Sequence, residues 1–214
     1  MTIKRFWADP YQTELATRIS RVDGERVWLE ETIFYAFSGG QESDSGRIAG
    51  QPVRLAEKLG MDIAYTLDAG HGLQAGDAVA VEIDWPRRYR LMRLHFAAEL
   101  VLEVICRQVD GVEKIGAHIA EDKARIDFVL DLPITPLLAD IAAAAQRLIN
   151  DDLPIVSAFS DEAAGRRYWE LPGFARVPCG GTHLKRSGEV GRIALKRRNI
   201  GKGKERVEID LLEP

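Results

Sequence analysis

Short runs in which apolar and polar residues alternate fill the first part of the chain. Two of them, residues 15–22 and 26–29, flank Asp23-Gly24, a dipeptide typical of a tight hairpin turn. Similar runs follow at residues 31–37, 47–49, 52–55, 62–66 and 78–83, with glycine-rich or polar turns at 38–46 and 68–72. Many short strands joined by such turns predict a small β-barrel, which we assign to residues 1–86.

The pattern changes at Asp84-Trp85-Pro86. Over residues 87–108 apolar side chains recur at a spacing near 3.6, which predicts one long helix. Asp84 is suited to cap this helix and Pro86 to occupy its first turn.

From residue 87 onward, helical and extended patterns alternate. We predict strands at residues 125–130, 155–159, 168–171, 191–198 and 206–212, a helix at 136–151, a helical turn at 161–166 and a loop at 199–204. The predicted fold class is therefore α+β, with a β-barrel domain at residues 1–86 and an α/β domain at residues 87–214.

The chain has 214 residues, of which 46% are hydrophobic and 29% charged, an ordinary composition for a soluble globular protein with one large or two small domains. Its formal net charge of -4 gives no sign of nucleic acid, so any such contact must come from a local patch. No apolar stretch approaches the roughly 20 residues of a membrane helix, and the N-terminus lacks the apolar core of a signal peptide. We expect a cytoplasmic protein without a membrane partner.

Two cysteines occur in very different surroundings. Cys106 lies in an apolar run and is predicted to be a small core residue. Cys179 is followed by two glycines, a threonine and His183. The glycines permit a tight turn that can direct the thiolate and the imidazole towards one point.

A second pair of chemically active side chains lies on the predicted long helix. His95 and Glu99 are four residues apart, so they project from the same face. With Cys179 and His183 they offer nitrogen, oxygen, sulfur and nitrogen donors, a set suited to tetrahedral zinc. Taken alone, the helical pair is more often an ion pair on a solvated face, and neither spacing is a strong metal signature. The two pairs together predict the metal site.

Four segments resemble one known family, in the order in which that family has them. The segment Cys179-Gly180-Gly181-Thr182-His183 resembles the Cys-Gly-Gly-Thr-His segment of alanyl-tRNA synthetase editing domains and of their free-standing AlaX relatives. Residues 187–191, Ser-Gly-Glu-Val-Gly, resemble the family's Thr-Gly-Glu-Ile-Gly, and residues 87–95 resemble the segment that leads into its His-x-x-x-His. Residues 32–41 are similar to its Thr-x-Phe-Tyr segment ending in Gly-Gly-Gln, continued by Asp44-Ser45-Gly46. The four matches extend over nearly the whole chain.

This resemblance implies a fold and an activity. The fold is a small N-terminal β-barrel joined to a two-layer α/β editing domain, as in threonyl- and alanyl-tRNA synthetases. The implied reaction is zinc-dependent hydrolysis of the ester in tRNA for alanine that wrongly carries serine or glycine. Nothing in the chain resembles the aminoacylation domain of the synthetase, so we expect no ATP-dependent charging.

Further site residues follow from the resemblance. Thr32 is expected to bind the hydroxyl of serine, and Gln41 to position water or the terminal adenosine. The plainer alternatives are that these are a strand residue and a turn residue. Basic residues are expected to hold the tRNA, so that added salt weakens deacylation; they are Arg87, Arg88 and Arg93 on the helix and Lys196, Arg197, Arg198, Lys202 and Lys204 near the C-terminus.

The sequence departs from the family pattern at two positions. Glu99 stands where the family has its second helical histidine, and Phe96 where a threonine is usual. Three outcomes stay open: Glu99 ligates zinc, three ligands and a water remain, or metal binding is lost; His118 is a substitute ligand if Glu99 does not bind.

The alternatives to the implied function follow from these two positions. One is a non-catalytic RNA-binding relative with a vestigial metal site, and the other is an enzyme that removes a different amino acid because of Phe96. Two further questions stay open at this point: whether zinc activates water or positions substrate, and whether the protein is a monomer or a homodimer.

Overall fold

The computed structural model describes residues 1–130, 133–201 and 203–212, and its contacts divide the chain into two compact units. Unit 1 comprises Met1–Ser38 and Glu42–Arg90, and unit 2 comprises Gly39–Gln41 and Leu91–Pro214. Both units contain β-sheet, and the chain also forms α-helices outside the sheets. The α+β class is therefore confirmed. The functional division into a barrel domain at 1–86 and an editing domain at 87–214 stays a prediction.

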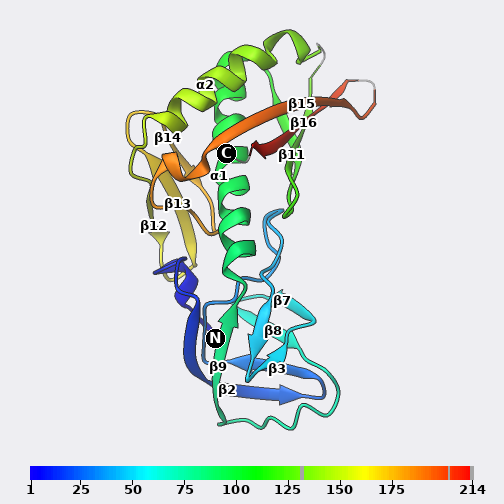
Figure 1. The fold of residues 1–214 in the computed structure, drawn as a ribbon, viewed down its shortest axis with the longest axis vertical. Helices are drawn as coiled ribbons and strands as arrows, with labels where there is room; N and C mark the ends of the chain where they lie inside the picture. The colour runs from blue at the N-terminus through cyan, green and yellow to red at the C-terminus, as the bar shows by residue number, and fades with distance from the viewer. Residues whose placement is uncertain (131–132, 202, 213–214) are drawn as a thin grey trace. The chain divides into compact units, whose positions relative to one another are not determined.

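Unit 1 is built on a seven-stranded antiparallel sheet with the strand order β6-β5-β9-β2-β3-β8-β7 (Figure 1). Its strands are β2 (Glu14–Asp23), β3 (Arg26–Leu29), β5 (Gly46–Ile48), β6 (Gln51–Pro52), β7 (Leu55–Leu59), β8 (Asp62–Thr66) and β9 (Ala78–Ile83). A short parallel pair, β1 (Ile3–Lys4) with β4 (Glu31–Thr32), and the 3-10 helix η1 (Arg5–Trp7) accompany it.

The sheet of unit 1 curls into a half-barrel instead of closing into the predicted barrel. Among the described residues no ladder joins its edge strands, β6 and β7. Strand β6 has two residues, and one of them, Pro52, has no N–H to offer a further strand. Side chains from the concave face fill the half-barrel, and those of Ile19, Val27, Ile63 and Val81 are almost completely buried. Each such burial stabilises the fold by roughly 1.5–3 kcal/mol relative to exposure.

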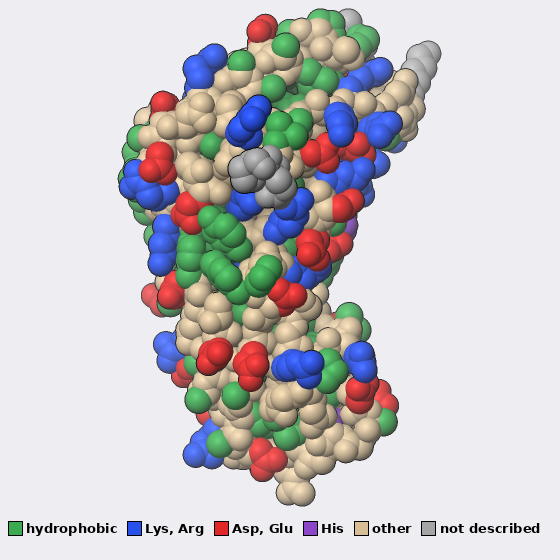
Figure 2. Space-filling model, viewed as in Figure 1, with side chains coloured by type: hydrophobic (Ala, Val, Ile, Leu, Met, Phe, Trp, Pro, Cys, Tyr) green, Lys and Arg blue, Asp and Glu red, His purple; other side chains and the backbone are tan. Residues whose placement is uncertain are grey.

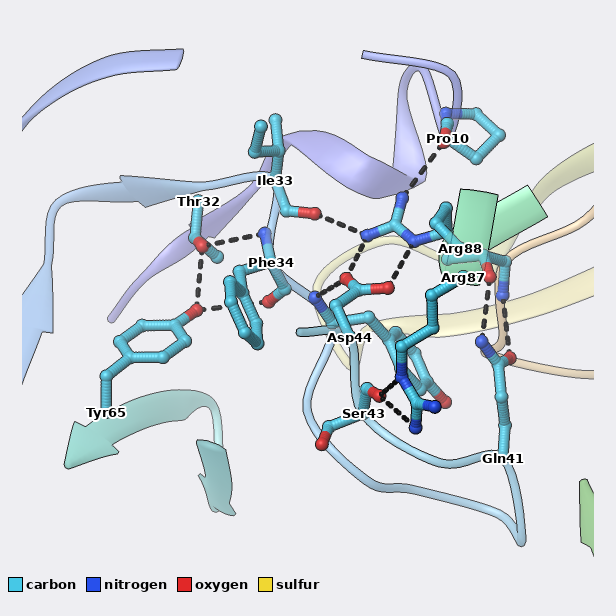
Figure 3. A network of polar contacts seen from close by, with 12 residues as sticks. Pro10, Thr32, Ile33, Phe34, Gln41, Ser43, Asp44, Tyr65, Arg87 and Arg88 are labelled. Atoms are coloured by element: carbon cyan, nitrogen blue, oxygen red, sulfur yellow. Dashed lines mark hydrogen bonds and ion pairs between the residues drawn. The ribbon is translucent and has the colours of Figure 1, made fainter. Parts of the chain in front are cut away.

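The predicted strand at residues 31–37 is only partly correct, because the ladder ends at Thr32. Residues 33–36 are buried without a strand partner, and side chains bind their backbone instead. Asp44 accepts a hydrogen bond from the N–H of Tyr35 at 2.7 Å, and Arg88 donates one to the carbonyl of Ile33 at 2.6 Å (Figure 3). Side chains from distant parts of the sequence thus supply the backbone hydrogen bonds that a neighbouring strand would supply if residues 33–36 continued β4.

Unit 2 contains most of the long helix α1 (Trp85–Gln108), whose first six residues belong to unit 1. The N–H of Arg87 donates to the Asp84 carboxylate at 3.2 Å, so the predicted cap is confirmed. Two antiparallel sheets lie at the flanks of α1 (Figure 1). One has the order β10-β11-β16-β15, and the other has the order β12-β13-β14.

The remaining elements of unit 2 follow α1 in chain order. They are β10 (Glu113–Ile119), β11 (Ala124–Val129), η2 (Thr135–Leu137), α2 (Leu138–Asn150), β12 (Val156–Asp161), β13 (Arg166–Leu171), β14 (Ala175–Pro178), η3 (Ser187–Val190), β15 (Arg192–Asn199) and β16 (Lys204–Leu212). No helix in the described part of the chain is long and apolar enough to cross a membrane.

Two local predictions for unit 2 are wrong. Residues 161–166 form the turn of a β-hairpin and not a helical turn, because the Asp161 carboxylate binds the N–H of Ala164 at 3.0 Å and Gly165 takes a positive φ of 62°. Cys106 is exposed and not in the core. Its neighbour Ile105 is fully buried, and the next position along a helix is turned by about 100° from it, towards solvent.

Candidate metal centre

Four side chains of unit 2 meet at one point inside it. His95 and Glu99 come from consecutive turns of α1, and Cys179 and His183 come from the turn after β14. The ligand atoms of the four all lie within 4.8 Å of one another. The convergence that the sequence predicts for two distant segments is therefore present.

The distances between neighbouring donors suit a single metal ion. Nε2 of His95 lies 3.4 Å from Oε1 of Glu99 and 3.5 Å from Sγ of Cys179, and Nε2 of His183 lies 3.3 Å from Oε2 of Glu99. Ligands held at 2.0–2.3 Å in a tetrahedron are about 3.3–3.8 Å apart. In the described part of the chain, Oε2 of Glu99 and Nε2 of His183 are buried without a hydrogen bond, as atoms reserved for an ion would be.

Charge compensation within the cluster also fits a divalent cation. Burial lowers the pKa of both histidines, but Glu99 and Cys179 outweigh it and raise the pKa of His95 and of His183. Burial raises the pKa of Glu99, but the two imidazoles lower it overall. Burial and Glu99 raise the pKa of Cys179, and the imidazoles again outweigh them and lower it. The cluster thus sets two acidic side chains against two basic ones, and a divalent ion bound by Glu99 and Cys179 would take the place of protons on the imidazoles.

The Cys179–His183 turn packs against the His95 ring of α1 and is held by the side chain of Gln41. A Cβ at Gly181 would lie 2.1 Å from Cε1 of His95, so only glycine fits there. The amide of Gln41 binds Thr182 twice: its Nε2 donates to the Thr182 hydroxyl at 2.9 Å, and its Oε1 accepts from the Thr182 N–H at 3.3 Å. Gly40, just before Gln41, accepts a hydrogen bond from the N–H of Ile119 at 2.8 Å. Gln41 therefore fixes the turn that carries two of the four donors.

Ser157 on β12 makes a contact behind the cluster that the sequence did not reveal. Its Oγ lies 3.3 Å from Nδ1 of His183. A partner on the outer ring nitrogen sets the orientation of a ligating histidine, so that Nε2 faces the other three donors. A serine on a short strand carries no pattern that would have singled it out.

Thr32 and Phe96, the two positions expected to recognise the amino acid, are both fully buried. Thr32 belongs to unit 1, and its hydroxyl lies 2.7 Å from the phenol of Tyr65 and accepts from the N–H of Phe34 at 3.0 Å (Figure 3). Phe96, in unit 2, packs edge to face on Trp169 with a centroid distance of 5.1 Å. Phe96 therefore fills the space between α1 and β13. His118 lies on β10 and is not one of the four clustered donors.

The basic residues predicted on α1 are engaged with protein groups. Arg88 is fully buried; it pairs with Asp44 and also donates to the Pro10 carbonyl at 2.9 Å, which excludes it from a surface that binds nucleic acid. Arg87 pairs with Glu42 at 2.7 Å, and Arg93 donates to the carbonyl of Val190 at 3.0 Å.

The basic residues predicted near the C-terminus separate into two groups. Lys196, Arg198 and Lys204 are exposed. Arg197 points to the other face of β15, where its Nε and Nη2 donate to the two carboxylate oxygens of Glu205 at 2.5 and 2.6 Å. Lys202 lies outside the described residues. Figure 2 shows basic and acidic side chains interspersed around β15 and β16.

Three further cations, two of which the sequence did not single out, share the face of Lys196 and Arg198. Register places Lys196 beside Glu208 and Arg198 beside Arg206, and Arg125 of β11 also faces Glu208. The acids on this face are covered by cations: Asp127 by Arg206 at 2.6 Å and by Arg125, and Glu208 by Lys123 at 2.9 Å and Arg198 at 3.1 Å. We call this set the cationic face; its five cations, Lys123, Arg125, Lys196, Arg198 and Arg206, exceed its three acids, Asp127, Glu208 and Asp210.

The fold and the site together define an α+β protein with a buried four-donor cluster able to hold a metal. Residues 172–208, which include the Cys179–His183 turn, match the threonyl and alanyl tRNA synthetase second additional domain. The chain is 31% identical to the alanyl-tRNA editing protein AlaX-M of Methanosarcina acetivorans over 100% of both chains. It is 33% identical to that of Saccharolobus solfataricus, over 97% of this chain and 98% of the relative.

The chain belongs to the family of AlaX-M alanyl-tRNA editing proteins. It is also 33% identical to the alanine–tRNA ligase of Ignicoccus hospitalis, over 97% of this chain but only 26% of the ligase. The resemblance found in the sequence motifs is therefore confirmed.

Proposed function

We propose that this chain hydrolyses the aminoacyl ester of tRNA for alanine that carries serine or glycine, and that it does so without aminoacylation activity. One observation carries the proposal: in a member of the AlaX-M family, a carboxylate, a sulfur and two imidazoles lie within 4.8 Å of one another. Such a cluster can hold a metal ion, and water or an ester would reach that ion if one of the four donors leaves or the coordination expands to five.

Zinc is the proposed metal, because one thiolate and two imidazoles are the donors it prefers. His95, Glu99, Cys179 and His183 would hold it, and zinc there supplies the Lewis acidity that favours attack of water on an ester. Glu99 makes the donor set more anionic than a second histidine would, which lowers that Lewis acidity. The surrounding residues have positioning roles: Ser157 orients His183, and Gln41 holds the turn.

Thr32 is proposed to distinguish serine from amino acids without a hydroxyl. Tyr65 donates its phenolic proton to the carbonyl of Phe34 at 3.1 Å, so the Thr32 hydroxyl must donate to Tyr65 and accept from Phe34. What Thr32 retains is acceptor capacity, which suits a ligand hydroxyl that donates. This role stays a prediction, beside the plainer one of a residue in the interior of unit 1.

The cationic face is the proposed contact for the tRNA backbone, together with Lys204. The acids beneath its cations hold the guanidinium groups in place, and the surplus of positive charge remains available to phosphates. Because phosphate contacts release counterions, binding by this face weakens as salt is added.

The proposal is tested by deacylation of alanine tRNA esterified with serine, glycine or alanine, together with metal analysis of the purified protein. We expect about one zinc per chain, hydrolysis of the serine and glycine esters, and loss of both zinc and activity in Cys179→Ala and His183→Ala. Cys106→Ala is the matched control, because it removes the other cysteine, which is exposed and outside the cluster. Full activity in Cys179→Ala would contradict hydrolysis that depends on this metal centre. A wild-type protein that binds tRNA but hydrolyses none of the esters would favour the non-catalytic alternative.

A further inference from the structure

An exposed aromatic ring lies on the side of β12 that faces the metal centre. Ser157 and Phe159 are two residues apart on this strand, so their side chains project from the same face. Ser157 touches His183, which identifies this face as the one beside the centre. Phe159 is 36% exposed, although large apolar side chains are usually buried.

Phe159 belongs to a row of three side chains that ends at a metal donor. It is the register partner of Arg167 on β13. The N–H of Cys179 donates to the carbonyl of Arg167 at 2.9 Å, which continues the β13–β14 ladder beyond the pairing of Tyr168 with Pro178. Neighbouring strands are about 4.8 Å apart, so the backbone of Phe159 lies roughly 10 Å from that of Cys179.

Arg167 packs against the Phe159 ring and restrains its orientation, which favours stacking of a second flat group on the ring. Its guanidinium carbon lies 4.7 Å from the ring centroid of Phe159, and Arg167 is only 6% exposed. A cation that backs one side of an aromatic ring and is itself held in the protein leaves the ring in a fixed orientation. The ring, not the guanidinium, is what this site presents to solvent.

We propose that Phe159, backed by Arg167, stacks on the terminal adenine of the tRNA. The inference rests on the proposed function, because in that substrate a single ribose separates the adenine from the ester. An ester at the four-donor cluster therefore brings the base within reach of a ring two strands away. Stacking on an aromatic side chain needs only the flat face of a base, and it contributes affinity without base-specific hydrogen bonds.

The first test measures the kinetics of deacylation in Phe159→Ala and Phe159→Trp. Loss of one base–aromatic stack should raise KM roughly 5- to 150-fold in Phe159→Ala with little change in kcat, and Phe159→Trp should retain the wild-type KM. Val156→Ala is the matched control, because Val156 is 43% exposed on the same strand but projects from the opposite face. An unchanged KM in Phe159→Ala would overturn the subsite.

The second test does not depend on catalysis. Adenosine 5′-monophosphate and ribose 5-phosphate are titrated against the zinc-loaded protein, and binding is followed by saturation transfer to the ligand protons. We expect transfer to the adenine protons in the wild type and in Val156→Ala, its loss in Phe159→Ala and Phe159→Leu, and no binding of ribose 5-phosphate. Equal binding of the nucleotide by wild type and Phe159→Leu would contradict stacking, since leucine keeps the apolar bulk.

The two tests separate this inference from the proposed function. A wild-type protein that binds the nucleotide through Phe159 but hydrolyses no ester would keep the subsite and refute the deacylase. A deacylase whose Phe159→Ala variant keeps its KM and its nucleotide binding would refute the subsite alone. Zinc content is measured in every variant to establish that the centre is intact.

Discussion

At the scale of single residues, the two glycines of the Cys179–His183 turn have different requirements. A Cβ at Gly181 would lie 2.1 Å from Cε1 and 2.7 Å from Nδ1 of His95, and 2.9 Å from Oε1 of Gln41. A Cβ at Gly180 would meet no atom within 4 Å. Gly181 is therefore required because a Cβ would clash, whereas space around Gly180 would admit one.

Gly181→Ala should displace the His95 ring and reduce bound zinc to well below one per chain, because a ring and an added methyl group cannot occupy the same space. Zinc content by atomic emission, with far-ultraviolet circular dichroism as a check on folding, measures this. Gly180→Ala is the control and should bind zinc as the wild type does. Normal zinc content in Gly181→Ala would show that the turn is not packed on the helix as described.

At the scale of elements, one buried ion pair connects the start of α1 to the loop after residue 38. Arg88 and Asp44 have no exposed side-chain surface, and Nε of Arg88 donates to Oδ1 of Asp44 at 2.7 Å. The same guanidinium and carboxylate bind backbone groups of Pro10, Ile33 and Tyr35. The Asp-Ser-Gly segment of the family resemblance thus includes a residue that organises the interior of unit 1.

Removal of one member of this pair should be strongly destabilising. Arg88→Met or Asp44→Leu leaves a buried charge without its partner, which lowers the free energy of unfolding by about 3–5 kcal/mol. Urea denaturation measures the change, and the double variant should lose less than the sum of the two single changes. Arg54→Met is the control in the same unit, since Arg54 pairs with Asp68 at the surface, and it should unfold close to the wild type.

At the scale of the whole molecule, the metal should stabilise unit 2 and leave unit 1 unchanged. All four donors belong to unit 2, and a ligand that binds only the folded state stabilises it by about 2.7 kcal/mol at a hundredfold excess over Kd. Chelation should therefore increase amide hydrogen exchange in β13 and in Leu91–Gln108 of α1. The amides of β2, β3 and β9 serve as the internal control, and equal deprotection of both units would contradict a metal role confined to unit 2.

The negative net charge of the chain does not indicate a nucleic-acid partner, whereas the positive charge of the cationic face does. The whole chain carries -4, while the cationic face has two more positive than negative side chains. Only the strand register revealed this, because Lys123 and Arg125 lie far in sequence from Lys196, Arg198 and Arg206. Arg88 and Arg197 show the reverse. Both stand among basic residues in the sequence, but Arg88 is fully buried and Arg197 binds Glu205 on the other face of β15.

The sequence by itself determined most of the strands, the long helix and the four side chains that cluster in unit 2; it did not predict β10 or β14. Alternation and the 3.6-residue spacing reflect which side chains must leave water, and the motifs carry donor atoms whatever their surroundings. Tertiary structure decided what depends on contacts between distant segments. These are the open half-barrel, the buried state of Arg88, the hydrogen bond between Thr32 and Tyr65, and the two hydrogen bonds by which Gln41 holds Thr182. A hydrogen bond or ion pair across many residues leaves no periodic trace in the chain, because its geometry exists only once the segments have packed.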